Sequence, residues 1–241
     1  MSTTTLDVVS VPHLVAHPGT SPSVTVPMVG AAAPDVDDVW GHLAEPADFF
    51  GLVIPPVAVL ADALRAVVPA PTLSAVTVTL VAGESRFVVT AAPVRPVRSE
   101  PVRIDRCDVD VPLTLPEDPH WQRMAARTTS RADRDQLRRW LAARGVADAV
   151  CAHGPFVPFL GALIYTRDGD TLGVDNPEPV SLLAQLQRSG AIDDVRRVTV
   201  GPADGDTVWW LSPDYELHPV SAIGDTVHPI SGDAPTFARL P

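Results

Sequence analysis

The chain contains no lysine, so all 18 of its lysine or arginine residues are arginine. A side chain that forms a Schiff base needs a primary amine that can lose its proton. The guanidinium group of arginine stays protonated and cannot take this role. The sequence therefore excludes covalent catalysis by a lysine amine. Arginine in place of lysine, beside abundant alanine, valine and proline, also indicates a GC-rich bacterial genome.

Positive charge is scarce overall, and the formal net charge is -11 at pH 7. Phosphate contacts need a basic face, so a nucleic-acid partner is not expected, nor is binding to an anionic membrane surface. No apolar run approaches the roughly 18 residues of a membrane-spanning helix. Residues 1–30 lack a positive segment followed by an apolar run, so we expect no secretory signal and a cytoplasmic location.

Cysteine is equally rare, since Cys107 and Cys151 are the only two. In a cytoplasmic chain we expect two free thiols and no disulfide. Cys151 and His153 form the only close pair of cysteine and histidine. No second cluster has the spacing of a zinc site, so we expect no bound metal. A thiol beside an exposed histidine is the simpler interpretation, and a Cys/His activity stays open as an alternative.

Strand-like and helix-like segments alternate along the 241 residues, which indicates a mixed α/β fold with two domains. We expect an extended arm over residues 1–35, a smaller α/β domain over 36–111, a linker over 112–120 and a larger α/β domain over 121–241. The expected helices span residues 55–68, 131–144 and 178–189. The expected strands span residues 23–29, 74–81, 86–91, 102–111, 147–152, 160–166, 171–174, 196–200, 207–211 and 216–222.

Three local sequences are similar to those of the class IV aminotransferases, which include branched-chain aminotransferases and aminodeoxychorismate lyase. Residues 145–150 (GVADAV) resemble a family phrase of the form G-x-D-D-A-[LV], and residues 162–169 (ALIYTRDG) resemble the family hairpin that follows it. Residues 208–225 (VWWLSPDYELHPVSAIGD) resemble the family's C-terminal passage. The resemblance implies a two-domain fold with an abbreviated N-terminal domain, a cleft between the domains, and a homodimer.

The family binds pyridoxal phosphate (PLP), and this sequence departs from the residues that do so. Carried over by position, the family's lysine falls on Arg127, its glutamate on Val157 and its asparagine on Ala162. The phosphate-binding segment between the hairpin and the next helix is missing, because residues 174–179 are too short for it. The resemblance therefore implies the fold of a PLP enzyme, while the residues predict that no PLP is bound.

Candidate ligand-binding residues follow from the same comparison. Arg127, Thr128, Thr129 and Arg131 put two cations and two hydroxyls at the position of the family's site. Arginine binds carboxylates and phosphates through paired hydrogen bonds, so these residues predict an anion-binding site. The alternative is the exposed start of a helix that Ser130 caps.

The C-terminal half supplies the other candidates. Tyr215 and His218 lie in the segment that corresponds to a loop of the family's active site. Histidine can transfer protons near neutral pH. Strand alternation predicts that one of Trp209 and Trp210 is in the core and that the other faces outward or a cleft. The further residues that we expect to line a substrate site are Tyr165, Trp210 and Ser212.

Two functions are consistent with these residues. The first is a repurposed, PLP-independent enzyme of specialised metabolism that acts on a small anionic metabolite in the interdomain cleft. Arg127 and Arg131 would bind the anion, and His218 or Tyr215 would move protons. The second is a non-catalytic protein that kept the fold as a binding or interaction subunit.

Overall fold

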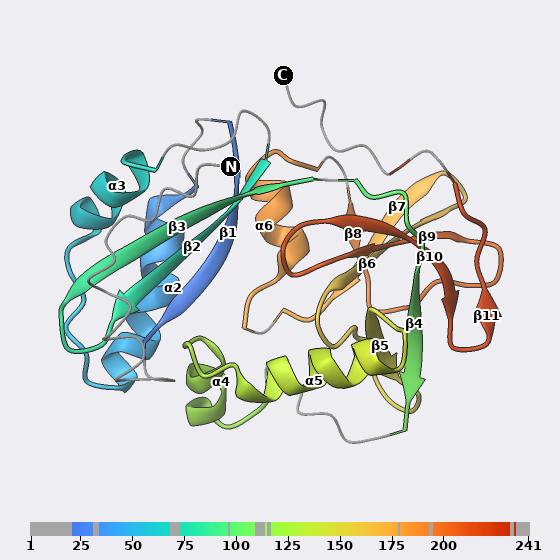
Figure 1. Ribbon diagram of the computed structural model, residues 1–241, viewed down its shortest axis with the longest axis horizontal. Helices are drawn as coiled ribbons and strands as arrows, with labels where there is room; N and C mark the ends of the chain where they lie inside the picture. The colour runs from blue at the N-terminus through green and yellow to red at the C-terminus, as the bar shows by residue number, and fades with distance from the viewer. Residues whose placement is uncertain are drawn as a thin grey trace. The chain divides into compact units, whose positions relative to one another are not determined.

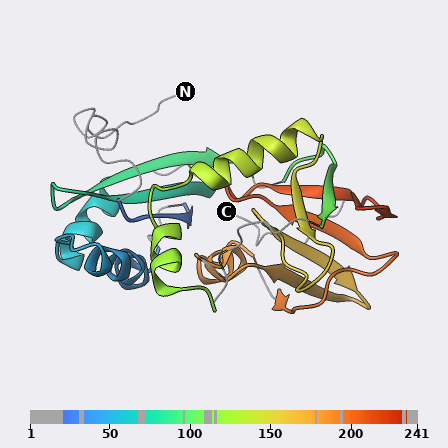
Figure 2. The ribbon, with the colours of Figure 1, turned by 90° about the horizontal axis from the view of Figure 1, so that it is seen from below.

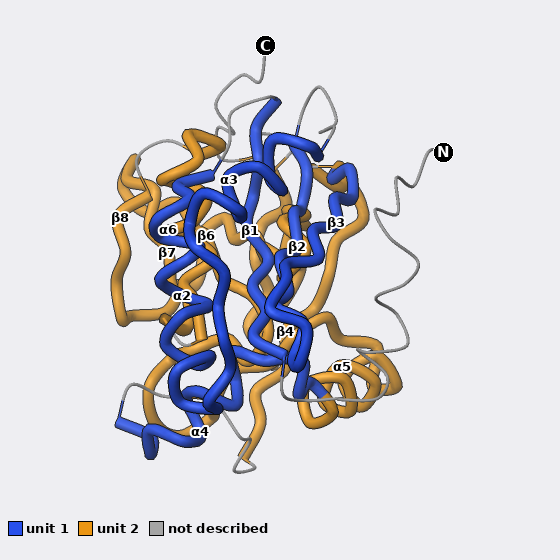
Figure 3. Tube along the Cα trace, turned by 90° about the vertical axis from the view of Figure 1, so that its left-hand side faces the viewer, with its two compact units in different colours: residues 1–94, 116–131 blue, residues 95–115, 132–241 orange. Residues whose placement is uncertain are grey.

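The computed structural model describes residues 21–30, 34–67, 73–95, 97–108, 114, 117–177, 179–192, 195–231 and 234. The chain divides into two compact units (Figure 3), of which unit 1 comprises residues 1–94 and 116–131 and unit 2 comprises residues 95–115 and 132–241. Each unit combines helices with a sheet, so the predicted mixed α/β class is confirmed. None of the described helices is long and apolar enough to cross a membrane.

Unit 1 is a three-stranded antiparallel sheet with helices packed against it (Figure 1). Its elements are β1 (Ser23–Val29), α2 (Val36–Phe49), α3 (Val57–Arg65), β2 (Leu73–Val81), β3 (Arg86–Val94) and α4 (His120–Ala126). The strand order is β1-β2-β3. Leu43 of α2 and Leu60 and Leu64 of α3 are fully buried in the core that also holds Val76 and Val78 of β2. Burial of these apolar side chains is what holds the helices on the sheet.

Unit 2 is built on one large mixed sheet, with its strands in the order β5-β4-β10-β9-β6-β7-β8 and β11 paired to β10. Its elements are β4 (Val102–Cys107), α5 (Ala132–Ala143), β5 (Asp148–Cys151), β6 (Ala162–Arg167), β7 (Asp170–Asp175), α6 (Leu182–Arg188), β8 (Arg196–Arg197), β9 (Thr207–Leu211), β10 (Leu217–Ile223) and β11 (Thr226–Val227). Strands β4 and β5 are parallel, and α5 lies between them in sequence as a crossover helix. Helix α5 runs beside β5 in both ribbon views (Figures 1 and 2).

The β6–β7 hairpin forms as predicted from its turn sequence. Asp168 and Gly169 occupy the two turn positions with φ values of 53° and 87°. Positive φ at both central residues is typical of the tight turn whose twist matches that of paired strands. Aspartate and glycine tolerate this conformation better than other residues. The turn fixes the register, in which Ala162 pairs with Asp175.

The unit boundaries differ from the expected domain boundaries. Strand β4 was expected at the end of the smaller domain, but it pairs with β5 and β10 and so belongs to unit 2. Residues 116–131 fall within unit 1, where the Ser23 N–H donates to the Arg127 carbonyl at 2.8 Å and Thr128 forms a bridge with Pro22. Long-range strand pairing decides these boundaries, and composition does not reveal it. Residues 1–20 of the expected arm and 109–113 of the expected strand and linker lie outside the described residues.

Two helices were not predicted. Helix α2 begins after Asp35, whose side chain caps it by accepting from the amides of Asp37 and Asp38. The helix contains Gly41 and Pro46, two residue types that disfavour a helix interior. Helix α4 begins at His120, the last residue of the expected linker, and ends at Ala126. The expected helix over 178–189 is shorter, since α6 begins at Leu182 and is capped by Ser181.

Candidate functional site

The residues that sequence reasoning selected fall into two groups, one in each unit. The group in unit 1 comprises Arg127, Thr128, Thr129 and Arg131. The group in unit 2 comprises Tyr165, Trp210, Ser212, Tyr215 and His218.

His218 is the most notable side chain of the unit 2 group. It lies on β10 directly opposite Trp210 of β9, so strand pairing puts both rings on one face of the sheet, with centroids 5.6 Å apart. Its Nε2 lies 3.6 Å from a carboxylate oxygen of Glu216. Its Nδ1 is buried and has no hydrogen-bond partner among the described residues. A buried polar atom without a partner is rare in native proteins, and one explanation is a site for a ligand or water.

Glu216 is held in place from its other side. The Arg98 guanidinium forms an ion pair and a hydrogen bond with this carboxylate, which raises the pKa of Arg98. The segment that carries Arg98 runs beside β10, since the Arg98 N–H donates to the Leu217 carbonyl at 2.8 Å. Arg98, Glu216 and His218 thus form a chain in which a cation orients a carboxylate and the carboxylate faces an imidazole. Arg98 and Glu216 were not predicted, although Glu216 directly precedes β10 and lies two residues before His218, the spacing that places side chains of extended backbone on one face.

Tyr215 is in a different situation from His218. Its side chain is fully buried, and its hydroxyl donates a hydrogen bond to the side chain of Gln185 on α6. Burial raises the pKa of Tyr215. Its backbone has a φ of 65°, which residues other than glycine rarely adopt and which the turn before β10 requires. These contacts favour a structural role for Tyr215 over the predicted proton transfer.

The side chains of the remaining unit 2 candidates are buried or form hydrogen bonds within the unit. The Ser212 hydroxyl accepts from the backbone amides of Asp214 and Glu216 and so stabilises the β9–β10 turn. Tyr165 is fully buried, and its hydroxyl donates to the Val200 carbonyl at 2.6 Å. Of the two placements expected for the second tryptophan, outward or into a cleft, the outward one is wrong, because Trp209 and Trp210 are both buried, at 3% and 8% exposure.

Trp210 takes part in a buried polar site that sequence reasoning did not find. Its indole Nε1 donates to the carboxylate of Asp148 at 2.9 Å, which also accepts from the amides of Ala149, Leu160 and Gly161. Burial raises the pKa of Asp148 even though all four donors favour its charged form. A Cβ at Gly161 would lie 2.2 Å from the Leu211 carbonyl oxygen, so only glycine allows this close approach of the loop. The site joins the start of β5 to the start of β6.

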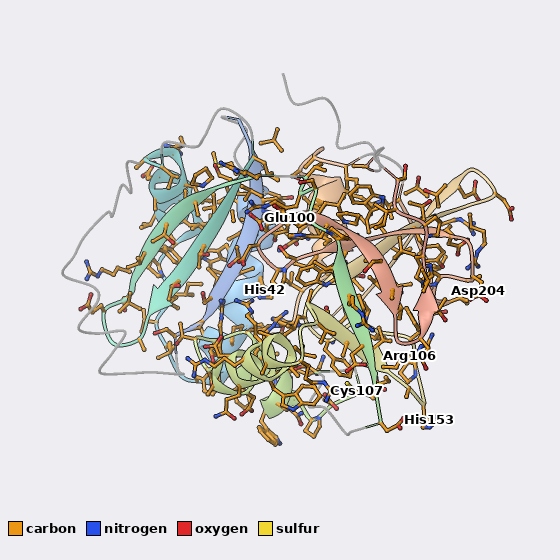
Figure 4. The ribbon with its side chains drawn as sticks, turned by 45° about the vertical axis from the view of Figure 1, so that its right-hand side comes forward. His42, Glu100, Arg106, Cys107, His153 and Asp204 are labelled. Carbon is orange, nitrogen blue, oxygen red and sulfur yellow. The ribbon has the colours of Figure 1, made fainter. Side chains whose placement is uncertain are left out.

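In unit 1, Arg127 is the C-cap of α4, and its guanidinium pairs with Glu45 of α2. His42 lies one helical turn before Glu45 on α2, and Figure 4 shows it on this helix. Burial and, to a smaller extent, the charge of Arg127 lower the pKa of His42 to about 4. The imidazole is therefore neutral at pH 7 beside a guanidinium that is already paired. His42 was not predicted, and only its position one turn from Glu45 would have indicated it.

The neighbours of Arg127 support the local structure. The Thr128 hydroxyl is buried and donates to the Ala125 carbonyl at 2.7 Å. The Thr129 N–H donates to the Ser21 carbonyl at 2.9 Å, and Arg131 lies 3.5 Å from the Ser23 hydroxyl. The structure brings these residues together at one end of α4 but already uses many of their polar groups.

The Cys/His alternative gains no support. Cys151 is half-buried at the end of β5, and His153 is exposed and lies 3.4 Å from Asp108 (Figure 4). Across the part of the chain that the structure describes, no group of three or more His, Cys, Asp or Glu side chains is placed to hold a metal ion.

Comparison with solved structures decides the fold. An apo structure of a hypothetical aminotransferase from Mycobacterium tuberculosis superposes with a TM-score of 0.65 at 17% identity, covering 96% of this chain and 90% of that one. A fold IV transaminase, CpuTA1, from Curtobacterium pusillum gives 0.60 at 17% identity, covering 88% and 80%. The chain has the fold of the fold type IV aminotransferases.

More distant matches agree, and sequence comparison adds nothing further. A putative 4-amino-4-deoxychorismate lyase from Legionella pneumophila superposes with a TM-score of 0.53 at 12% identity, covering 88% of this chain and 86% of that one. No family model matches the sequence, and no curated protein matches it. At these identities the likeness shows the fold alone.

The residues of this chain do not fit the PLP that the fold implies. No lysine is available to hold the cofactor, and the Arg127 guanidinium is paired with Glu45. The family resemblance places phosphate binding between the β6–β7 hairpin and α6, and Asp175, the last residue of β7, has its carboxylate at the start of this segment. Asp175 accepts from the Ser181 hydroxyl at 2.7 Å and from the Leu183 amide at 3.1 Å. A phosphate there would compete with Asp175 for the same donors.

Proposed function

We propose that the protein is an aminotransferase-like enzyme that works without PLP and acts on a small anionic metabolite. The observation that carries this proposal is the buried, unpartnered Nδ1 of His218, beside a carboxylate that Arg98 holds. A proton-transfer group of this kind is typically an imidazole whose other nitrogen faces an orienting carboxylate. In this arrangement Glu216 faces Nε2, and Nδ1 is left to exchange a proton with a bound molecule.

The absence of PLP chemistry is supported by three features of the chain. There is no side-chain amine for a Schiff base, the residue at the lysine position is a paired arginine, and Asp175 takes two donors near the start of α6. Each change alone would weaken cofactor binding, and together they remove both of its anchors. The proposed chemistry therefore runs through His218 and not through a cofactor.

A metabolite screen tests the enzyme proposal. Small carboxylates and phosphates would be screened by thermal shift, since a specific ligand raises the Tm with its concentration. Each hit would then be followed for turnover by mass spectrometry. We expect His218→Gln to keep binding and to lose at least 100-fold in turnover. Equal turnover by the wild-type protein and the variant would contradict the assignment of His218.

The proposed anion site at Arg127 needs a separate test, because Glu45 already neutralises this guanidinium. A substrate carboxylate would have to displace Glu45. One structure of the hypothetical aminotransferase from Mycobacterium tuberculosis is described as bound to alpha-ketoglutarate, so we choose this dicarboxylate as the probe. We expect Glu45→Gln to bind it more tightly than the wild-type protein and Arg127→Ala not to bind it. Identical binding by all three proteins would exclude Arg127 as an anion site.

The second candidate is a non-catalytic binding or interaction subunit. The internal use of the Tyr165 and Tyr215 hydroxyls and the burial of Trp210 favour it, because they leave fewer groups for chemistry. It predicts ligands that raise the Tm but are never converted. In either case we propose a homodimer, as the family resemblance implies, and light scattering of the purified protein would distinguish one chain from two.

A further inference from the structure

The only two cysteines of the chain are direct register partners. Cys107 is the last residue of β4 and Cys151 is the last residue of β5, and these neighbouring strands pair in parallel with Cys107 opposite Cys151. The two residues are separated by a whole crossover that includes α5. Nothing in the local sequence brings them together, so the pairing is a product of the fold.

Both thiols lie on the same face of the sheet. Cys107 belongs to the small core beneath α5 that includes Leu141, Ala149 and Phe159, and Cys151 packs against this core. Adjacent strands are about 4.7–4.9 Å apart, which is inside the roughly 4.4–6.8 Å range of Cα separations found in disulfides. The Ala152 N–H donates to the Cys107 carbonyl at 3.0 Å, so the two strands are still held side by side at the cysteines. The geometry therefore allows the two sulfurs to be joined.

We propose that Cys107 and Cys151 form a reversible dithiol–disulfide couple that is oxidised by a low-molecular-weight disulfide such as oxidised glutathione. The structure describes the reduced state, in which neither cysteine is part of a disulfide. This inference is independent of the function proposed above.

The more exposed of the two thiols is expected to react first. Cys151 is half-buried and reachable, whereas Cys107 is 7% exposed. The Cys151 thiolate would attack one sulfur of oxidised glutathione, forming a mixed disulfide and releasing one glutathione. The Cys107 sulfur, after loss of its proton, would then attack the Cys151 sulfur and displace the second glutathione. In balance, two protein thiols are oxidised to one disulfide, and one glutathione disulfide is reduced to two thiols.

The surroundings of Cys107 agree with its place as the second, resolving thiol. Burial and the charge of Asp105 raise the pKa of Cys107, with Arg144 opposing this shift. A thiol with a raised pKa is a poor first nucleophile in solution. It can still react with a sulfur that is held beside it, because the two strands supply the proximity. Figure 4 shows Cys107 on β4.

The cross-link would act on the edge of the sheet. Strand β5 is the terminal strand of the unit 2 sheet and contacts only β4 within its strand order. A disulfide would tie this edge strand to its neighbour and would close a loop of more than 40 residues, which restricts the unfolded chain. We therefore expect the oxidised protein to have a Tm about 5 °C higher than the reduced protein.

The test uses the full-length reduced protein incubated with oxidised glutathione, followed by alkylation and intact mass measurement. We expect the wild-type chain to lose two hydrogens without retaining glutathione, and a reductant to reverse this change. Cys107→Ala should stop at the mixed disulfide with one glutathione bound. Cys151→Ser should remain unmodified, because the buried Cys107 is not reached.

Two results would overturn the proposal. One is a wild-type chain that keeps two alkylatable thiols, or one bound glutathione, after the incubation. The other is a disulfide between two chains on a non-reducing gel. Both variants keep a small side chain at the substituted position, so we expect them to fold. Circular dichroism would check this before their thiols are compared.

Discussion

Asp148 is a carboxylate with no exposed surface and four N–H donors directed at its oxygens. Asparagine has one acceptor oxygen, and its amide group would face donors instead of accepting from them. Leaving buried donors without acceptors costs about 1–3 kcal/mol. We therefore expect Asp148→Asn to lower the free energy of unfolding by about 2–3 kcal/mol, measured by urea denaturation.

A matched control is Asp170→Asn. Asp170 is also an aspartate of the unit 2 sheet, but its side chain is 66% exposed and pairs with the similarly exposed Arg196. Surface ion pairs contribute at most about 1 kcal/mol. An Asp148→Asn variant no less stable than this control would mean that the Asp148 carboxylate does not hold the β5 and β6 segments together.

His42 makes the stability of the protein depend on pH. Its pKa is lowered from 6.5 to about 4 in the folded protein, so between these values the unfolded chain binds more protons. The free energy of unfolding should therefore fall as the pH falls from about 6.5 to about 4. Allowing for solvent screening, the contribution is about 2 kcal/mol.

The measurement compares wild-type protein with His42→Gln by urea denaturation at pH 7.5 and pH 4.5. Carboxylates contribute to acid sensitivity in both proteins, and the difference between them isolates the imidazole. We expect the variant to lose less stability on acidification than the wild-type protein. Parallel losses would show that His42 is protonated freely in the folded state.

At the scale of elements, the start of α6 is held by two side chains in series. The Ser181 hydroxyl accepts from the Ala184 amide at 3.0 Å and donates to Asp175 at 2.7 Å. We expect Ser181→Ala to lower the free energy of unfolding by about 1 kcal/mol, because it removes the cap and one hydrogen-bond partner of the half-buried Asp175 carboxylate. Urea unfolding of the wild-type protein and the variant would measure this difference in the free energy of unfolding.

Ser181→Thr provides the comparison, since it keeps the hydroxyl. If both variants lose the same stability, then the hydroxyl is not what caps α6.

Elements with a strong local signal could be predicted from sequence. The β6–β7 hairpin follows from its Asp-Gly turn, and α5 follows from the amphipathic pattern around Leu137 and Leu141. Helix α2 was missed because its only clear signal, the Asp35 cap, precedes a segment interrupted by Gly41 and Pro46.

The site could be predicted only in part. The sequence pointed to His218, but its partners depend on pairing between distant segments. Arg98 reaches Glu216 because residues 97 and 98 run beside β10, 118 residues away. Asp148 and Trp210 are likewise joined by the sheet and not by any local motif. Tyr165 and Tyr215, which we expected at the substrate site, are fully buried in the core.

At the scale of the whole molecule, the fold and the PLP chemistry usual for it depend on different residues. Backbone topology is kept, because it depends on apolar burial and strand pairing that tolerate 12–17% identity to solved structures. Cofactor chemistry depends on a few side chains, and a fold supports it only while they remain. In the correspondence that the family resemblance implies, the lysine position carries Arg127, and the Asp175 carboxylate lies at the start of the short segment before α6.

The most direct test of this account is the absorption spectrum of the purified protein after incubation with PLP and exhaustive dialysis. We predict that no band of a protein-bound Schiff base survives dialysis, and that reduction with borohydride before dialysis attaches no cofactor to a side chain. A stable band with PLP retained in proportion to protein would contradict the central claim that this fold type IV chain has lost its cofactor site.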